Sequence, residues 1–205
     1  MNDSISYQQQ LYAGTRAQLI DAIHVKLRDK RFEHVLRVEQ TALVLAEQNG
    51  VDLEKASIAG LVHDYAKQRS DKDFVAMIEK HQLDPDLLNW GNAIWHGVVG
   101  AEFVRDELGI NDEDILNAVR HHTTGAVAMS PLEQVVYMAD YIEPGRTVPG
   151  IEEARRITNE DLQAGVAYQT AHTLAYLIKQ QAPVYPGTIL TYNRWVAGKK
   201  MKYNY

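Results

Sequence analysis

Apolar residues recur every three to four positions along most of the chain, and strict alternation of apolar and polar residues is scarce. This spacing is typical of amphipathic helices that bury one face. The pattern predicts an all-α fold with short connections between its helices. Helices are predicted at residues 15–29, 31–49, 52–65, 93–108, 112–122, 130–142, 159–181 and 188–196. Two further helices are predicted to begin at Ser70 and at Asp84–Pro85.

Residues that favour helix ends support several of these boundaries. Ser70 and Asp73 have the spacing of a capping box, and Ser130, Pro131 and Glu133 are a strong signal for the start of a helix. Gly50 and Gly109 follow apolar stripes and are expected to end their helices. The segment 145–158 lacks a strong pattern, so we expect a loop there with room for one short helix.

The chain has 205 residues, of which 45% are hydrophobic, enough to build one domain with a sizeable core. We expect the helical domain at residues 15–197, a loosely ordered N-terminal segment at 1–14 and a tail at 198–205. The N-terminus has no basic and apolar leader, and no apolar run approaches the roughly 20 residues of a membrane span. The expected protein is soluble and cytoplasmic, without a membrane partner.

The net charge and the absence of cysteine exclude or disfavour several classes of function. The formal net charge of −6 disfavours a broad nucleic-acid surface, although a metal can reverse the charge locally in a phosphate-binding pocket. The chain has no cysteine, which excludes disulfides, zinc–thiolate sites and a cysteine nucleophile.

Six polar residues stand on helix stripes that are otherwise apolar. Four imidazoles and two carboxylates on inward faces indicate a metal site, because a buried carboxylate needs a cation or donors. Helical spacing alone does not show that these faces converge. The six residues are His34, His63, Asp64, His96, His122 and Asp140.

A single histidine on an apolar stripe is more often a hydrogen-bonded core residue than a ligand. His24 has the same register as its apolar neighbours and is not assigned to the site. His81 is expected to be exposed, and His172 to make packing or polar contacts. His121 points about 100° away from His122 on the same helix, so only His122 is chosen.

The ordered pattern H…HD…H…H…D resembles the HD-domain superfamily of metal phosphohydrolases. Over about residues 15–195, the local sequence is similar to its YqeK-like branch, the symmetrical bis(5′-nucleosyl)-tetraphosphatases. The resemblance is also the reason why His34, and not His24, is assigned to the metal site. It implies the helical bundle of an HD domain. It rests on RFEHVLRVEQTALVLA, AGLVHDYAK, WHGVVGAEFV, AVRHHTTG and MSPLEQVVYMADYIEPGR.

The resemblance implies two groups of ligands that share one carboxylate, Asp64. One metal ion would be held by His34, His63, Asp64 and Asp140. A second ion, or the substrate phosphate, would be held by Asp64, His96 and His122. The family implies iron, whereas an imidazole-rich set is also compatible with manganese, nickel, cobalt or zinc.

The resemblance also implies substrate contacts. Lys67 and Arg146 would bind phosphate oxygens and assist catalysis together with Asp64. Without the resemblance, Lys67 could equally be a solvated lysine, and Arg146 would be interpreted as a surface arginine in a loop. Tyr185, Tyr192 and Asn193 match the nucleoside-contacting end of the family. Relatives often carry His where Tyr185 stands, which leaves base recognition open.

The activity implied is symmetrical hydrolysis of diadenosine tetraphosphate to two ADP, with nucleotides as the only partners expected. Three alternatives stay open at this point. The site could serve another nucleotide or phosphomonoester, it could be a di-iron oxygenase, or the chain could bind nucleotides without turnover. A homodimer is also left open by the sequence.

Overall fold

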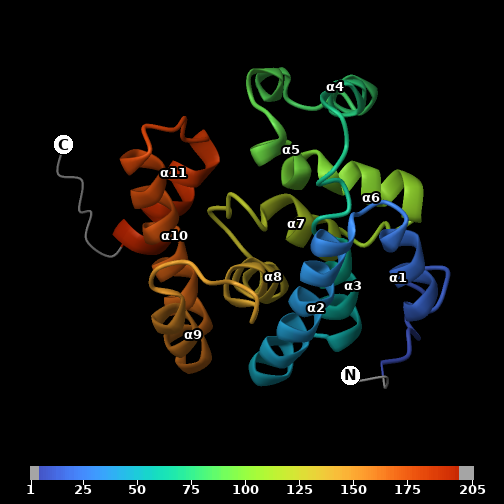
Figure 1. Ribbon diagram of the computed structural model, residues 1–205, viewed down its shortest axis with the longest axis horizontal. Helices are drawn as coiled ribbons and strands as arrows, with labels where there is room; N and C mark the ends of the chain where they lie inside the picture. The colour runs from blue at the N-terminus through green and yellow to red at the C-terminus, as the bar shows by residue number, and fades with distance from the viewer. Residues whose placement is uncertain (1–4, 199–205) are drawn as a thin grey trace.

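The computed structural model describes residues 5–198 and is all-α over this range, as predicted (Figure 1). Of the predicted tail at 198–205, all but Gly198 lies outside the described residues. No helix within residues 5–198 combines the length and the apolar character needed to cross a membrane. The helices are α1 (Arg16–His24), α2 (Asp29–Asn49), α3 (Leu53–Val62), α4 (Asp71–Lys80), α5 (Asn92–Val98), α6 (Gly100–Leu108), α7 (Glu113–His121), α8 (Pro131–Ile142), α9 (Ile151–Glu160), α10 (Leu162–Lys179) and α11 (Pro186–Tyr192), with a 3₁₀ helix at Pro85–Asn89 and a π-helical turn at Asn193–Ala197.

Helices α2, α3, α7 and α8 form the centre of the molecule, where α2 packs on both α3 and α8, and α7 packs on α3 and α8. Helices α9, α10 and α11 lie on one side of this centre, and α1 and α4–α6 lie on the other (Figure 1). The apolar stripes of the central helices meet in a core that includes Leu45, Ile58, Leu116 and Met138, all at most 1% exposed. Each of the six polar residues predicted for the metal site belongs to a central helix, to its end, or to α5.

The capping signals in the sequence are confirmed. Ser70 and Ser130 both form complete capping boxes, at the starts of α4 and α8. Gly50 and Gly109 end α2 and α6 in the left-handed conformation that favours glycine, with φ values of 66° and 67°.

Several predicted boundaries are wrong. Helix α1 ends at His24 rather than at residue 29, and the predicted helix 93–108 is two helices that meet at Val99. The segment 145–158, where a loop with room for one short helix was expected, contains most of the ten-residue helix α9. The long helix α10 begins after Asp161, not at Asn159, because the Asp161 carboxylate accepts hydrogen bonds from the first free backbone amides.

The start of the described chain, within the segment predicted to be loosely ordered, makes contacts with α3. The Glu54 carboxylate accepts hydrogen bonds from the backbone amides of Gln8, at 2.7 Å, and Gln9, at 3.1 Å. The hydroxyls of Tyr7 and Ser57 lie 3.0 Å apart. These contacts fix the segment before α1 against the buried face of α3.

A glycine allows α3 to approach α2 closely at the level of the site. A Cβ atom on Gly60 would lie 2.9 Å from the Cα of Glu39, so a larger residue would force the two helices apart. The same turn of α3 leads into His63, whose ring centroid is 5.5 Å from that of His34 on α2. Close helix packing therefore brings the first two histidines of the pattern together.

Candidate metal centre

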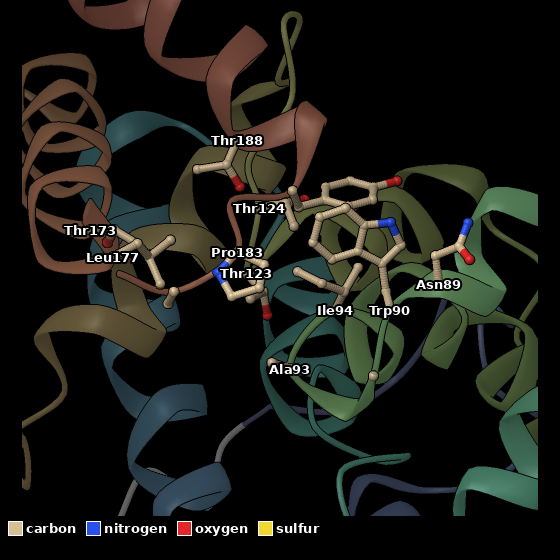
Figure 2. Close-up of a pocket in the computed structure, with 13 residues that line it drawn as sticks. Asn89, Trp90, Ala93, Ile94, Thr123, Thr124, Thr173, Leu177, Pro183 and Thr188 are labelled. Atoms are coloured by element: carbon tan, nitrogen blue, oxygen red, sulfur yellow. The ribbon is translucent and has the colours of Figure 1, made fainter. Parts of the chain in front are cut away.

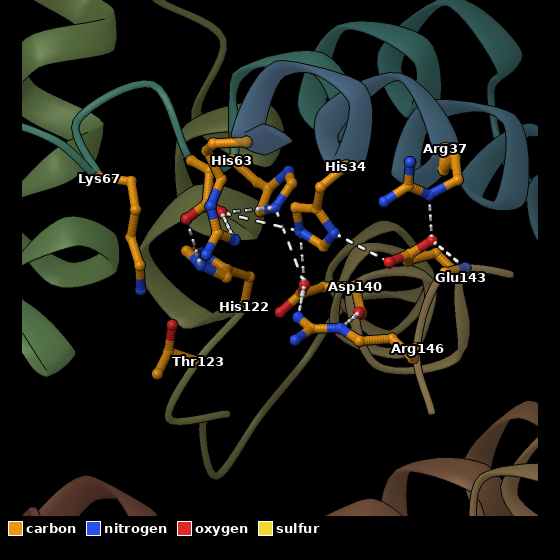
Figure 3. A network of polar contacts seen from close by, with 12 residues as sticks. His34, Arg37, His63, Lys67, His122, Thr123, Asp140, Glu143 and Arg146 are labelled. Carbon is orange, nitrogen blue, oxygen red and sulfur yellow. Dashed lines mark hydrogen bonds and ion pairs between the residues drawn. The ribbon is translucent and has the colours of Figure 1, made fainter. Parts of the chain in front are cut away.

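The six polar residues predicted from their stripes converge in one cluster (Figure 3). Five of them are at most 6% exposed, and the side chain of Asp140 is 18% exposed. They come from five different helices or helix ends, namely His34 on α2, His63 and Asp64 after α3, His96 on α5, His122 after α7 and Asp140 on α8.

Asp64 stands at the centre of the cluster, and its two oxygens face different histidines. Its Oδ2 lies 3.4 Å from His63 Nε2 and 3.7 Å from His34 Nε2. Its Oδ1 lies 3.6 Å from His96 Nε2 and 3.8 Å from His122 Nε2. Asp140 adds an oxygen to the first group, 3.0 Å from His34 Nε2. The cluster therefore has two halves that share the Asp64 carboxylate.

Three of the four imidazoles are oriented by a backbone carbonyl. A carbonyl oxygen only accepts, so each Nδ1 carries the proton, and Nε2 of the neutral ring points its lone pair at the cluster. The pairs are His63 Nδ1 with Gly60 O at 2.7 Å, His96 Nδ1 with Asn92 O at 2.6 Å, and His122 Nδ1 with Val119 O at 2.7 Å.

The fourth imidazole is oriented by a buried carboxylate. His34 Nδ1 lies 3.1 Å from Oε1 of Glu143, which is 2% exposed. The other Glu143 oxygen accepts hydrogen bonds of 2.6 Å from Arg37 Nε and from the Gly145 amide (Figure 3). Burial opposes ionisation of Glu143, but these donors outweigh it and lower the pKa of the carboxyl. An ionised Glu143 accepts a hydrogen bond from His34 Nδ1–H, which turns Nε2 toward the cluster.

Two histidines are neutral at physiological pH. Burial lowers the pKa of His122 to about 3 and that of His96 to about 4. For His63, the nearby carboxylates of Asp64 and Asp140 outweigh burial and raise the pKa. The space between His63 and the two carboxylates therefore favours a positive charge.

The donor atoms fit a transition-metal ion. The buried atoms His34 Nε2, His63 Nε2 and Asp64 Oδ1 have no hydrogen-bond partner, which is costly unless a cation lies between them. Metal–ligand bonds of about 2.1 Å place neighbouring ligand atoms about 3–3.5 Å apart, close to the spacing seen here. Imidazole and carboxylate together suit iron, manganese, cobalt, nickel or zinc better than magnesium.

Three cationic side chains surround the cluster. Lys67 Nζ lies 3.0 Å from His96 Nε2, and Arg31 Nη1 lies 2.7 Å from Asp64 Oδ2. Arg146 donates through Nε to the backbone oxygen of Asp140, at 2.9 Å, and through Nη2 to its carboxylate. A set of cations around a metal cluster is suited to the oxygens of a polyphosphate.

A cavity of about 460 Å³ opens beside the His96 half of the cluster (Figure 2). Thr123 belongs to both, because it lines the cavity and its Oγ1 lies 3.0 Å from His96 Nε2. Trp90 and Tyr185 line the cavity, with their rings edge to face and 5.1 Å between centroids. The volume is within the usual range for a small-molecule site.

The residues predicted to bind substrate lie at different places in the structure. Tyr185 reaches the cavity, whereas Tyr192 and Asn193 do not line it. Lys67 and Arg146 reach the metal cluster, from opposite halves.

The four histidines left out of the prediction lie outside the cluster. His81 is half-buried rather than exposed. Each of the four has its own partner: Glu133 for His121, the Phe32 ring for His24, Asp106 for His81, and the Tyr168 ring for His172.

Sequence reasoning missed Arg31 and Glu143. It also did not assign Thr123, whose hydroxyl lies 3.0 Å from His96 Nε2, to the site. A signal was available for the first two, because Arg31 precedes His34 by three residues and Glu143 follows Asp140 by three. Residues three apart on a helix lie on the same face, so both were neighbours of a candidate ligand.

Comparison with known proteins identifies the family of this chain. The HD domain model matches residues 31–145, more than half of the chain. The symmetrical bis(5′-nucleosyl)-tetraphosphatase of Bacillus subtilis is 40% identical over 89% of this chain and 98% of its own length. The protein of the same name from Staphylococcus aureus is 39% identical, over 80% of this chain and 86% of its own.

A solved structure leads to the same family. The crystal structure of a predicted HD superfamily hydrolase involved in NAD metabolism, from Clostridium acetobutylicum, superposes with a TM-score of 0.84. It is 35% identical in sequence, and the match covers 90% of this chain and 97% of the other. By its sequence, its fold and its cluster of histidines and aspartates, this chain belongs to the HD-domain superfamily and, within it, to the family of symmetrical bis(5′-nucleosyl)-tetraphosphatases.

Proposed function

We propose that the protein hydrolyses diadenosine tetraphosphate at its central phosphoanhydride and releases two ADP. The observation that carries this proposal is the Asp64 carboxylate, which faces two groups of imidazoles inside a ring of three cations. The relatives that are similar over most of their length are named for symmetrical cleavage of bis(5′-nucleosyl) tetraphosphates.

Two sets of residues would hold the metal. His34, His63, Asp64 and Asp140 would bind one ion, and Asp64, His96 and His122 would bind a second ion or a substrate phosphate. Bound ions supply Lewis acidity and lower the pKa of a water toward neutrality. The buried Nδ1 hydrogen bonds keep the imidazoles in the orientation that this binding needs.

The cations of the site would act on the phosphates. Lys67 is beside His96 and Arg146 is beside Asp140, so the two flank the cluster from different sides. Arg31, next to Asp64, adds a third positive charge. They would offset the negative charge that builds up on the transferred and leaving phosphates. Because ADP is already a good leaving group, the reaction does not need a strong general acid.

The cavity beside Thr123 would hold one nucleoside. Its aromatic residues, Trp90 and Tyr185, offer ring surfaces on which a base can stack. Its position next to Lys67 and His96 would let the attached phosphates reach the cluster. We propose Tyr192 and Asn193 as further contacts to the nucleoside on the family resemblance alone.

We expect Tyr185→Ala to raise KM for diadenosine tetraphosphate about tenfold and to change kcat less, since stacking on one base contributes about 1–3 kcal/mol. Steady-state kinetics of the metal-loaded enzyme measure both constants. Tyr176→Ala is the control, because Tyr176 is 61% exposed on α10 and does not line the cavity. An unchanged KM in Tyr185→Ala, or an equal rise in both variants, would place the base elsewhere.

The products distinguish the proposed reaction from its alternatives. We expect ion-exchange chromatography of a reaction with diadenosine tetraphosphate to show ADP only, without ATP and AMP. Faster release of phosphate from ATP, ADP or phosphomonoesters would favour another phosphohydrolase. Oxygen consumption with a non-phosphorylated substrate would favour an oxygenase. Nucleotide binding without turnover would favour a non-catalytic module.

We propose iron as the metal, with manganese, nickel, cobalt and zinc as alternatives that the same ligands accept. Elemental analysis of protein purified without chelators, followed by reconstitution with each ion, tests this choice. Cytoplasmic location and a homodimer stay predictions, which cell fractionation and light scattering can check.

A further inference from the structure

The end of α8 and the turn after it supply three of the side chains around the metal cluster. Asp140 lies in the last turn of the helix, which ends at Ile142, and Glu143 and Arg146 begin and close the following turn. The turn is closed by a hydrogen bond of 2.9 Å from the Arg146 amide to the Glu143 oxygen. Carbonyls at a helix C-terminus have no partner within the helix, so this segment needs donors from elsewhere.

Three carbonyls of this segment accept hydrogen bonds from one side chain, Arg155 on α9. Its Nε donates to the oxygen of Ile142 at 3.0 Å. Its Nη2 donates to the oxygens of Glu143, at 2.9 Å, and Arg146, at 3.1 Å. The planar guanidinium carries five donors in a fixed arrangement, which suits three carbonyls held at fixed positions. A cation at a helix C-terminus also interacts favourably with the helix dipole.

The carbonyls that Arg155 holds belong to residues whose side chains reach the site. The Glu143 side chain orients His34, and the Arg146 side chain binds Asp140. The turn is confined on its other side as well, because a Cβ atom on Gly145 would lie 2.7 Å from the Arg37 guanidinium. A shift of the turn backbone would therefore move both functional side chains together.

We propose that Arg155 is a positioning residue, which fixes the turn at residues 143–146 so that Arg146 reaches the substrate phosphates and Glu143 holds His34. The proposal rests on the proposed function, in which Arg146 contacts phosphate and His34 binds metal. Arg155 itself touches neither metal nor substrate. Its action is transmitted through the backbone of the turn.

A double-mutant cycle tests whether Arg155 acts through Arg146. Arg155→Met keeps most of the aliphatic stem and removes all the donors. We expect kcat to fall about 10–100-fold with KM changed less, as for other groups that orient site residues. In an Arg146→Ala background, the same change should cost at least about fivefold less, because coupled residues are not additive. Elemental analysis should also show less bound metal in Arg155→Met.

The neighbouring Arg156 is the matched control. It lies on the same helix, is more exposed, and pairs with Glu153 and Glu160 at the surface. Arg156→Met should leave kcat and metal content unchanged. Circular dichroism and thermal unfolding check the fold of each variant. If Arg155→Met does not fold, Arg155→Lys replaces it, with a smaller loss expected because one ammonium cannot serve three carbonyls.

The outcomes separate this inference from the proposed function. If the wild type and Arg156→Met leave diadenosine tetraphosphate intact, the proposed function is wrong. If both hydrolyse it and Arg155→Met does so equally well, the inference is wrong. The inference also fails if Arg155→Met loses the same factor with and without Arg146 and binds as much metal as the wild type, because Arg155 would then position neither Arg146 nor Glu143.

Discussion

Asp64→Asn is expected to lower kcat for diadenosine tetraphosphate about a thousandfold or more and to reduce bound metal. The substitution keeps the shape of the side chain but removes its charge and makes one of the two oxygens an amide nitrogen. Each oxygen of Asp64 faces two imidazoles, so both halves of the cluster lose an anionic ligand at once. Chromatography of ADP and elemental analysis measure the two effects.

The control for this experiment is Asp71→Asn, an exposed aspartate in the first turn of α4. Asp71→Asn should retain both activity and metal. Asp64→Asn with full metal content and near-wild-type turnover would contradict the site as we describe it. If Asp64→Asn loses metal but keeps its turnover, the result contradicts only the catalytic role of the metal, and the description of Asp64 as a metal ligand stands.

The parts of the site that could be predicted from sequence are those with a local signal. His34, His96 and Asp140 each occupy a stripe position three or four residues from apolar neighbours, and the structure buries these faces against one another. The capping boxes at Ser70 and Ser130 were equally local, since both partners lie within one helical turn. The periodicity of apolar residues could not show that the helix faces converge. His34, and not His24, was assigned to the metal site because of the ordered pattern of a known family.

The parts that could not be predicted depend on contacts between distant segments. The cavity beside the cluster joins Trp90 and Thr123 to Tyr185, residues that no spacing rule relates. Likewise, Arg155 meets the turn at residues 143–146 only because α9 folds back on α8. The bounds of α9 were not predicted, and only one short helix was allowed for in its segment, because its polar sequence carries few apolar residues to mark a buried face.

The second large effect is expected from Arg146→Ala, which should lower kcat about 10²–10³-fold, the usual loss when one preorganised donor to a transition state is removed. Arg146→Lys should recover only part of this loss, because an ammonium cannot reproduce the two-pronged contact of a guanidinium. Steady-state kinetics with diadenosine tetraphosphate give the values. Arg156→Ala, on the surface of α9, is the control for loss of an arginine.

Metal content distinguishes Arg146→Ala from Asp64→Asn. Arg146 would compete with a bound metal ion for the same Asp140 oxygen, which lies 3.0 Å from His34 Nε2. Burial opposes ionisation of Asp140, but His34 and Arg146 together lower the pKa of its carboxyl. Removing the arginine leaves this oxygen charged beside His34, so bound metal should be retained while kcat falls. Loss of metal in Arg146→Ala would instead mean that the arginine holds Asp140 in place for the ion and that its effect on kcat is indirect.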